Sequence, residues 1–180
     1  MKNMPPIELE RLNADMMSDR KDVRLNALKK MEELARAGQV DETVLPSLMF
    51  LLKSSIIDER RKASWIVAKL AQNKVDALWP LETFNNRITD EDPEVRENMA
   101  WALGELAGMR IGIQGSITHL TDLLLDEEAM VRGMAAWALG RFAERLNMGS
   151  PRAQELLEKL IRDESPYVSK SASYALERMR

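Results

Sequence analysis

Two stretches of the chain, DPEVRENMAWALGELA (Asp92–Ala107) and EAMVRGMAAWALGRFA (Glu128–Ala143), share one pattern and lie 36 residues apart. An arginine occupies the same place in both stretches and recurs at this interval along the chain. The arginines in this position are Arg24, Arg60, Arg96 and Arg132. A further step of 37 residues reaches Ser169. Self-similarity at a fixed period of this size is typical of repeat proteins, so the sequence predicts five copies of one structural unit.

Each unit carries apolar residues at five fixed distances from this arginine position. They lie 12 and 8 residues before it and 3, 7 and 10 residues after it, in all five units. These spacings trace one face of an α-helix. The pattern therefore predicts two amphipathic helices per unit, joined by a turn. The expected helix pairs are 6–17 with 20–37, 42–53 with 56–72, 76–89 with 93–108, 114–125 with 128–147, and 152–162 with 166–179.

Six residues before the arginine position, every unit has a short polar residue of the kind that caps helices and closes turns. These residues are Ser18, Ser54, Asp90, Asp126 and Asp163. No stretch alternates apolar and polar residues as a strand would. The expected fold class is all-α: a right-handed α–α superhelix, or solenoid, of five helix pairs with a period of about 36 residues. We expect a single domain, 1–180, with units at about 5–38, 41–74, 76–109, 113–147 and 150–180.

Eight residues after the arginine position, the three inner units have a small residue, whereas the outer two have Glu32 and Glu177. A small residue lets a neighbouring helix approach closely. Terminal repeats of a solenoid need a polar outer face. We therefore predict that Glu32 and Glu177 face water at the two ends of the array.

The two quoted stretches resemble the HEAT repeat, and more closely the short HEAT-like repeat of phycobilisome lyases. They share an Asp-bearing turn, then Val-Arg, then a helix of small residues that ends Ala-Leu-Gly. The resemblance covers nearly the whole chain and is weakest in the second unit, where Glu59-Arg60 replaces Val-Arg. It implies that the second helices line a concave surface and that a polar ladder joins neighbouring units. The implied ladder residues are Arg24, Arg60, Arg96, Arg132, Asp90 and Asp126.

An aromatic column lies five residues after the arginine position and holds four of the nine aromatic residues of the chain. Its members are Trp65, Trp101, Trp137 and Tyr174. The column lies beside the apolar stripe, which leaves two interpretations open. The rings are either binding anchors on the concave face, as large amphipathic side chains often are, or packing between repeats. The charged residues beside the column are Arg61, Lys69, Glu97, Glu105, Arg141 and Arg178.

Composition narrows the function further. The 26 Lys and Arg residues against 29 Asp and Glu give a net charge of -3, so no nucleic-acid partner is expected. The absence of Cys and the single His argue against thiol catalysis and against metal sites built on these residues, and we expect no cofactor. No apolar stretch approaches the roughly 20 residues that cross a bilayer, and no secretion signal opens the chain. A cytoplasmic protein without a membrane partner is therefore expected.

No catalytic constellation accompanies the single histidine, so the sequence does not predict an enzyme. The expected function is a non-catalytic protein–protein interaction module or scaffold that binds a segment of another protein or peptide on its concave face. Resemblance leaves two alternatives open. One is a HEAT-like DNA glycosylase-type enzyme that acts on nucleic acid, and the other is a chaperone of the bilin or cofactor lyase type.

Overall fold

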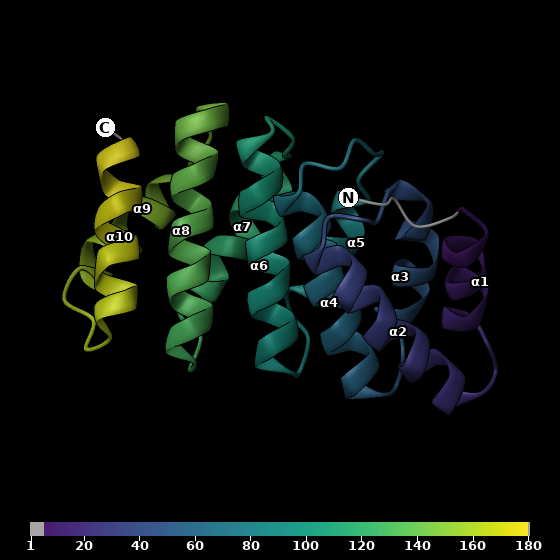
Figure 1. Ribbon diagram of the computed structural model, residues 1–180. Helices are drawn as coiled ribbons and strands as arrows, with labels where there is room; N and C mark the ends of the chain where they lie inside the picture. Colours follow the sequence, from purple (N-terminus) through teal and green to yellow (C-terminus); the bar gives the residue numbers. More distant parts are fainter. Residues whose placement is uncertain (1–5, 180) are drawn as a thin grey trace. The chain divides into compact units, whose positions relative to one another are not determined.

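The computed structural model describes residues 6–179, which contain helices and connecting segments and no strand (Figure 1). The helix pairs are α1 (Pro6–Met16) with α2 (Lys21–Arg36), α3 (Leu45–Leu51) with α4 (Ile57–Gln72), α5 (Leu81–Arg87) with α6 (Pro93–Gly108), α7 (Gln114–Leu123) with α8 (Ala129–Leu146), and α9 (Pro151–Leu160) with α10 (Pro166–Arg178). The predicted all-α solenoid of helix pairs is confirmed. The expected start of the first unit at residue 5 and the last residue, 180, lie outside the described residues.

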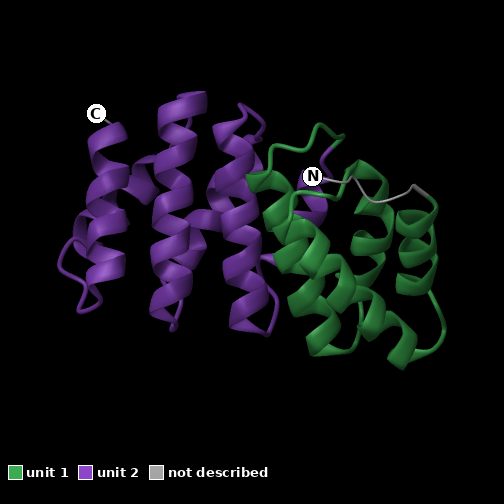
Figure 2. Cartoon of the chain, in the orientation of Figure 1, with its two compact units in different colours: residues 1–78 green, residues 79–180 purple. Residues whose placement is uncertain are grey.

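The chain forms two compact units, residues 1–78 and residues 79–180 (Figure 2). The first unit contains α1 to α4 and a short 3-10 turn, η1 (Glu42–Val44). Within it, α2 packs against α4 and α1 packs against α3. The second unit contains α5 to α10, and its second helices α6, α8 and α10 lie side by side in one layer (Figure 1). Helices α5, α7 and α9 form the other layer of this unit.

The apolar columns that the sequence predicts form the core of both units. On α6, for example, Met99, Leu103 and Leu106 are all fully buried. Each buried side chain of this size contributes about 1.5–3 kcal/mol through the hydrophobic effect. The last pair is less enclosed, since Ile161 is 42% exposed. This follows from its position after α9, whose main neighbours are α7 and α10.

One helix is much shorter than the sequence predicts. The expected helix over 76–89 is wrong for residues 76–80, because α5 begins only at Leu81. Pro80 precedes the helix, and a proline drives the residue before it away from helical geometry. In the second pair, η1 occupies residues 42–44 and α3 starts after it at Leu45. The other helix ends lie within two residues of the predicted ones.

All five turns between paired helices are closed in the same way. In each, the side-chain oxygen of the short polar residue accepts a hydrogen bond from the backbone N–H two residues later, as Asp and Ser commonly do in turns. The bonds run from Arg20 to Ser18 (3.2 Å), from Ile56 to Ser54 (3.0 Å), from Asp92 to Asp90 (3.0 Å), from Glu128 to Asp126 (3.0 Å) and from Ser165 to Asp163 (2.9 Å).

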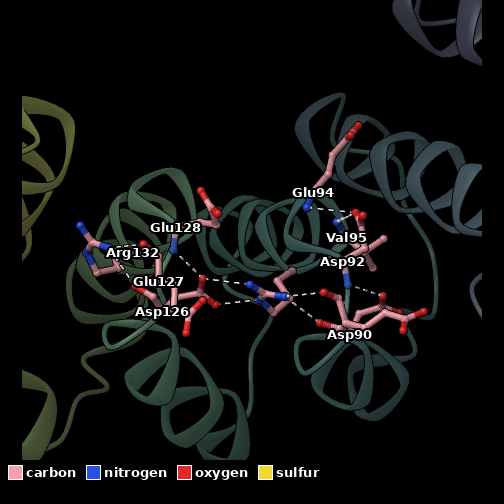
Figure 3. A network of polar contacts seen from close by, with 10 residues as sticks. Asp90, Asp92, Glu94, Val95, Asp126, Glu127, Glu128 and Arg132 are labelled. Carbon is pink, nitrogen blue, oxygen red and sulfur yellow. Dashed lines mark hydrogen bonds and ion pairs between the residues drawn. The ribbon is translucent and has the colours of Figure 1, made fainter.

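In the second unit, Arg96 and Arg132 each join the turn before them to the next turn, and Figure 3 shows the turns at Asp90 and Asp126. Arg96 donates from Nη1 to the backbone oxygen of Asp90 at 2.9 Å, and from Nε and Nη2 to the two carboxylate oxygens of Asp126 at 2.7 and 2.9 Å. Arg132 makes the same contacts to the backbone oxygen of Asp126, at 2.8 Å, and to the carboxylate of Asp163, at 3.0 and 3.2 Å. The planar guanidinium suits such two-point contacts. Its hydrogen bonds lower the pKa of Asp163.

In the first unit the ladder uses a different carboxylate. Arg24 donates to the backbone oxygen of Ser18 at 2.8 Å and to Oε1 of Glu59 at 2.9 Å. Glu59 is 1% exposed and also accepts a 2.5 Å hydrogen bond from the hydroxyl of Ser54. Glu59 therefore supplies the carboxylate that a serine at position 54 lacks. The departure of the second repeat from the Val-Arg pattern moves the acidic group of the ladder by five residues.

The prediction that Glu32 faces water is wrong. Its side chain is only 20% exposed, and it accepts a hydrogen bond from Nζ of Lys62 on α4 at 2.9 Å. Glu32 also pairs with Arg36 on its own helix. The reason is that the position eight residues after the arginine faces the following second helix. Glu177, at the same position of the last repeat, is exposed.

The role of Glu59 as the ladder carboxylate of the second repeat can be tested by moving the acidic group back to position 54. We expect Glu59→Val to lower the free energy of unfolding by about 1.5–3 kcal/mol, because Arg24 loses its charged partner in a largely buried place. Adding Ser54→Asp should restore most of this loss, because the aspartate then occupies the turn position of Asp126 and Asp163. Urea unfolding of the three proteins measures both steps. If the double variant is no more stable than Glu59→Val, Glu59 does not replace a carboxylate at position 54.

The ladder should also give a pH-dependent stability. We expect Arg132→Ala to cost about 1.5–3 kcal/mol at pH 7, because a two-point contact to a carboxylate is lost. Since Arg132 lowers the pKa of Asp163, its contribution is present above the ordinary aspartate pKa and is lost as the pH falls through the lowered value. The difference between variant and wild type should therefore shrink as the pH falls below the ordinary aspartate pKa in denaturant titrations.

Lys159→Ala is the control for this measurement. It removes an exposed ion pair with Glu155 on α9, which typically contributes no more than about 0.5 kcal/mol. Equal losses for Arg132→Ala and Lys159→Ala would show that Arg132 behaves as an ordinary surface charge.

Candidate functional site

The aromatic residues of the second unit lie at the same position on three neighbouring helices. Trp101 lies on α6, Trp137 on α8 and Tyr174 on α10, and we call these three residues the aromatic row. Each of them is half-buried. Trp65 holds the corresponding position on α4 of the first unit and is also half-buried. All four aromatic side chains thus keep part of their surface in contact with solvent.

Two rings of the aromatic row pack directly onto glycines of the preceding second helix. A Cβ atom added to Gly104 on α6 would collide with the ring of Trp137, and one added to Gly140 on α8 would collide with the ring of Tyr174. The glycines eight residues after the arginine position therefore make room for an aromatic side chain of the next repeat. The rings contribute to packing between successive helices and retain an exposed part, so the two interpretations of the column are compatible.

The charged residues beside the aromatic row mostly have partners within the protein. The guanidinium of Arg141 lies 5.8 Å from the Trp137 ring centroid and pairs with Glu144 at 3.1 Å. Arg178 lies 3.7 Å from the Tyr174 ring centroid, and its Nε is 3.6 Å from a carboxylate oxygen of Glu144. Both arrangements combine a cation–π contact with an ion pair.

Among the acidic residues, Glu105 accepts a 3.0 Å hydrogen bond from the indole Nε1 of Trp101, four residues earlier on α6. This bond orients the Trp101 ring along its own helix. Glu97, one helical turn before Trp101, differs from Glu105. Burial, and next the charge of Glu94, raise the pKa of Glu97.

In the first unit, the residues predicted to surround Trp65 lie on α4. The guanidinium of Arg36, from α2, lies 4.2 Å from the Trp65 ring centroid. Lys69 donates to Gln72 at 2.6 Å, and Arg61 is half-buried. Arg60 donates to the backbone oxygen of Ser54 at 2.9 Å, as the other ladder arginines do in their own turns.

Tyr167, near the start of α10, is a member of this surface that sequence reasoning missed. A Cβ atom added to Gly133 on α8 would collide with its ring, and its hydroxyl lies 3.9 Å from the sulfur of Met134. Burial, with the charge of Glu97, raises the pKa of Tyr167 to about 12. A signal was available: at this position the chain changes from acidic residues in the first three repeats to Met130 and Tyr167 in the last two.

Among residues 6–179, no group of three or more His, Asp or Glu side chains is placed to hold a metal ion. None of the described helices has the length and apolar character needed to cross a membrane.

The contact between Gly104 and the Trp137 ring predicts that the effect of Gly104→Ala on stability depends on whether the ring is present. In the wild-type background, Gly104→Ala should cost about 1–3 kcal/mol, because the added methyl group displaces the ring. In the Trp137→Ala background the same substitution should be neutral or stabilise by up to about 1 kcal/mol, because alanine favours helix more than glycine does. Chemical unfolding of the four proteins measures this coupling. The same cost in both backgrounds would show that the ring does not rest on Gly104.

Solved structures of engineered repeat proteins share this fold. An engineered protein from the Northeast Structural Genomics Consortium is 22% identical, with a TM-score of 0.74, over 96% of this chain and 79% of its own. A designed armadillo repeat protein in complex with the peptide (KR)4 is 20% identical, with a TM-score of 0.77, over 96% of this chain and 82% of its own. A computationally designed armadillo repeat protein for modular peptide recognition has a TM-score of 0.76 at 20% identity, with the same coverage. At these identities the likeness concerns the fold alone.

Sequence comparison gives the family. No curated protein sequence matches the chain significantly. The pattern described as HEAT repeats matches residues 81–177, which is more than half of the chain and runs from α5 into the last turn of α10. These are the helices that carry the aspartate–arginine ladder and the aromatic row. The chain belongs to the HEAT repeat family.

Proposed function

We propose that this protein is a non-catalytic interaction module or scaffold whose second helices bind a segment of another protein or peptide. The observation that carries the proposal is the aromatic row. Its three rings are half-buried, those of Trp137 and Tyr174 are seated on glycines, and part of each ring remains exposed. Large aromatic side chains of this kind commonly dominate the binding energy of protein interfaces.

Rigidity supports the same function. The Trp137 and Tyr174 rings are each held between a glycine of the preceding helix and a guanidinium of their own helix. A partner that contacts rings already held in place loses less conformational freedom than one that must order them. The binding residues we propose are Trp101, Trp137 and Tyr174 with Glu97, Glu105, Arg141 and Arg178 in the second unit, and Trp65 with Arg61 and Lys69 in the first.

Structural neighbours agree with a peptide or protein partner. One designed armadillo repeat protein of this fold was solved with the peptide (KR)4, and another was designed for modular peptide recognition. Both are designed repeat proteins, and peptides are their ligands. We extend this class of ligand, without its sequence, to the second-helix face of this chain.

The closer resemblance of residues 92–107 and 128–143 to the HEAT-like repeats of phycobilisome lyases supports a second candidate, a bilin or cofactor chaperone. In that case the aromatic row would hold a tetrapyrrole, and adding bilin would change the visible absorbance. A DNA glycosylase-type enzyme would instead bind duplex DNA, with an affinity that falls steeply as salt increases. Absorbance titration with bilin and a gel shift with duplex DNA therefore separate both alternatives from a protein partner.

The test is affinity capture from native extract with the wild type, Trp101→Ala and Trp137→Ala, followed by mass spectrometry. We expect both variants to lose the captured partner, because truncating a central aromatic anchor commonly costs about 2 kcal/mol or more of binding. Phe50→Ala is the matched control, since Phe50 is 49% exposed but lies on α3, a first helix. Circular dichroism at the capture temperature verifies that each variant is folded. The same proteins captured by all four would contradict the proposal.

A further inference from the structure

Glu97 is a charged, half-buried side chain beside the aromatic row that has no partner within the described part of the chain. Arg141, Arg178 and Glu105 are each paired or hydrogen-bonded. The side chain of Glu97 makes no hydrogen bond or ion pair among residues 6–179, and the like charge of Glu94 acts on it. A half-buried carboxylate that is left unpaired destabilises a fold, whereas an exposed one is solvated. Glu97 therefore calls for an explanation other than packing.

The register between α6 and α8 places Glu97 opposite a flexible apolar side chain. Gly104 on α6 receives the ring of Trp137 on α8, and Gly108 receives the side chain of Arg141. Seven residues before Gly104 and Trp137, about two helical turns on each helix, stand Glu97 and Met130. Met130 is 53% exposed. An unpaired carboxylate and an exposed methionine thus face one another at the same level of the two helices.

Tyr167 brings a third helix to the same place. Its ring covers Gly133 on α8, its hydroxyl lies beside the sulfur of Met134, and the charge of Glu97 acts on its phenol group. Gly133 contributes no side chain between the two. We call Glu97, Met130, Met134 and Tyr167 the Glu97 patch. It combines one carboxylate, two thioethers and one aromatic ring, and no basic residue belongs to it.

We propose that the Glu97 patch binds a basic side chain, arginine or lysine, of the partner segment that lies on the aromatic row. This inference rests on the proposed function and adds the chemistry of the partner. A carboxylate in a partly desolvated place attracts a cation more strongly than an exposed one does. Methionine side chains adapt to the aliphatic stem of lysine or arginine, and the tyrosine ring suits a cation. An acidic segment would instead bring a like charge to Glu97 and Glu94.

The proposal predicts opposite effects on folding and on binding. Burial raises the pKa of Glu97, so the folded protein binds the proton of this carboxyl more tightly than the unfolded chain does. The protein therefore loses stability as the pH rises from the ordinary glutamate pKa through the raised one. The titratable groups that act on it are Glu94 on α6 and Tyr167 on α10, while the α8 members of the patch carry no charge. Glu97→Gln should therefore melt at a higher temperature than the wild type at pH 7, and this gain should vanish below the ordinary glutamate pKa.

The binding test uses the full chain and fluorescence anisotropy. The probe is a fluorescein-labelled, end-capped peptide of four arginines separated by glycines. The comparison peptides replace arginine by citrulline, which keeps the shape without the charge, or by glutamate. We expect the wild type to prefer arginine over citrulline by about tenfold or more, and Glu97→Gln to lose most of this preference. Glu127→Gln is the matched control, because it removes the same charge from an exposed side chain in the turn before α8.

A second variant keeps the test independent of one substitution. Met130→Lys places an internal cation opposite Glu97, so it should also raise the melting temperature and lower the affinity for the arginine peptide at least tenfold. Equal losses for Glu97→Gln and Glu127→Gln, or a preference for the glutamate peptide, would overturn the inference. Native partner capture that fails with Trp101→Ala but survives Glu97→Gln would overturn it while leaving the interaction module intact. Capture unaffected by Trp101→Ala would instead overturn the proposed function itself.

Discussion

Each ladder arginine satisfies its own turn, and Arg24, Arg96 and Arg132 also reach a carboxylate of the next repeat. The last carbonyls of a helix have no partner within it, and positive charge is favoured at that end. Arg96 meets this need by donating to the backbone of Asp90 while gripping the carboxylate of Asp126. The same aspartate closes its own turn by accepting from Glu128. One side chain therefore fixes both the local turn and its distance from the next one.

This spacing brings successive second helices close enough for glycine to matter. Gly104, Gly133 and Gly140 each lie beneath an aromatic ring of the following helix in the second unit. A larger side chain at any of them would push the ring or the helix away. The close approach turns aromatic residues outside the apolar stripe into part of the packing, and their remaining surface is held still. A rigid, partly apolar face with charges along it is what an interaction module requires.

The charged residues along this face differ in whether the fold itself supplies a partner for them. Arg141 and Arg178 stack on aromatic rings and pair with Glu144, so their charges already have partners within the fold. Glu97 directly follows its ladder arginine, as Gly133 does in the next repeat, and the fold supplies no partner for its carboxylate. Groups that weaken a fold are expected where binding needs them. The opposite signs expected for Glu97→Gln in folding and in binding follow from this contrast.

The sequence by itself determined the helix pairs, the buried columns and the turn residues, because a period of 36 residues with helical spacing shows which residues share a face of one helix. The tertiary structure alone decided how those faces meet. It paired Arg24 with Glu59 rather than with a residue at position 54, turned Glu32 towards Lys62 instead of water, and laid Tyr167 across Gly133. Such choices depend on the register between helices and on the reach of side chains from one repeat to the next. A repeat period describes each helix separately and contains neither of these quantities.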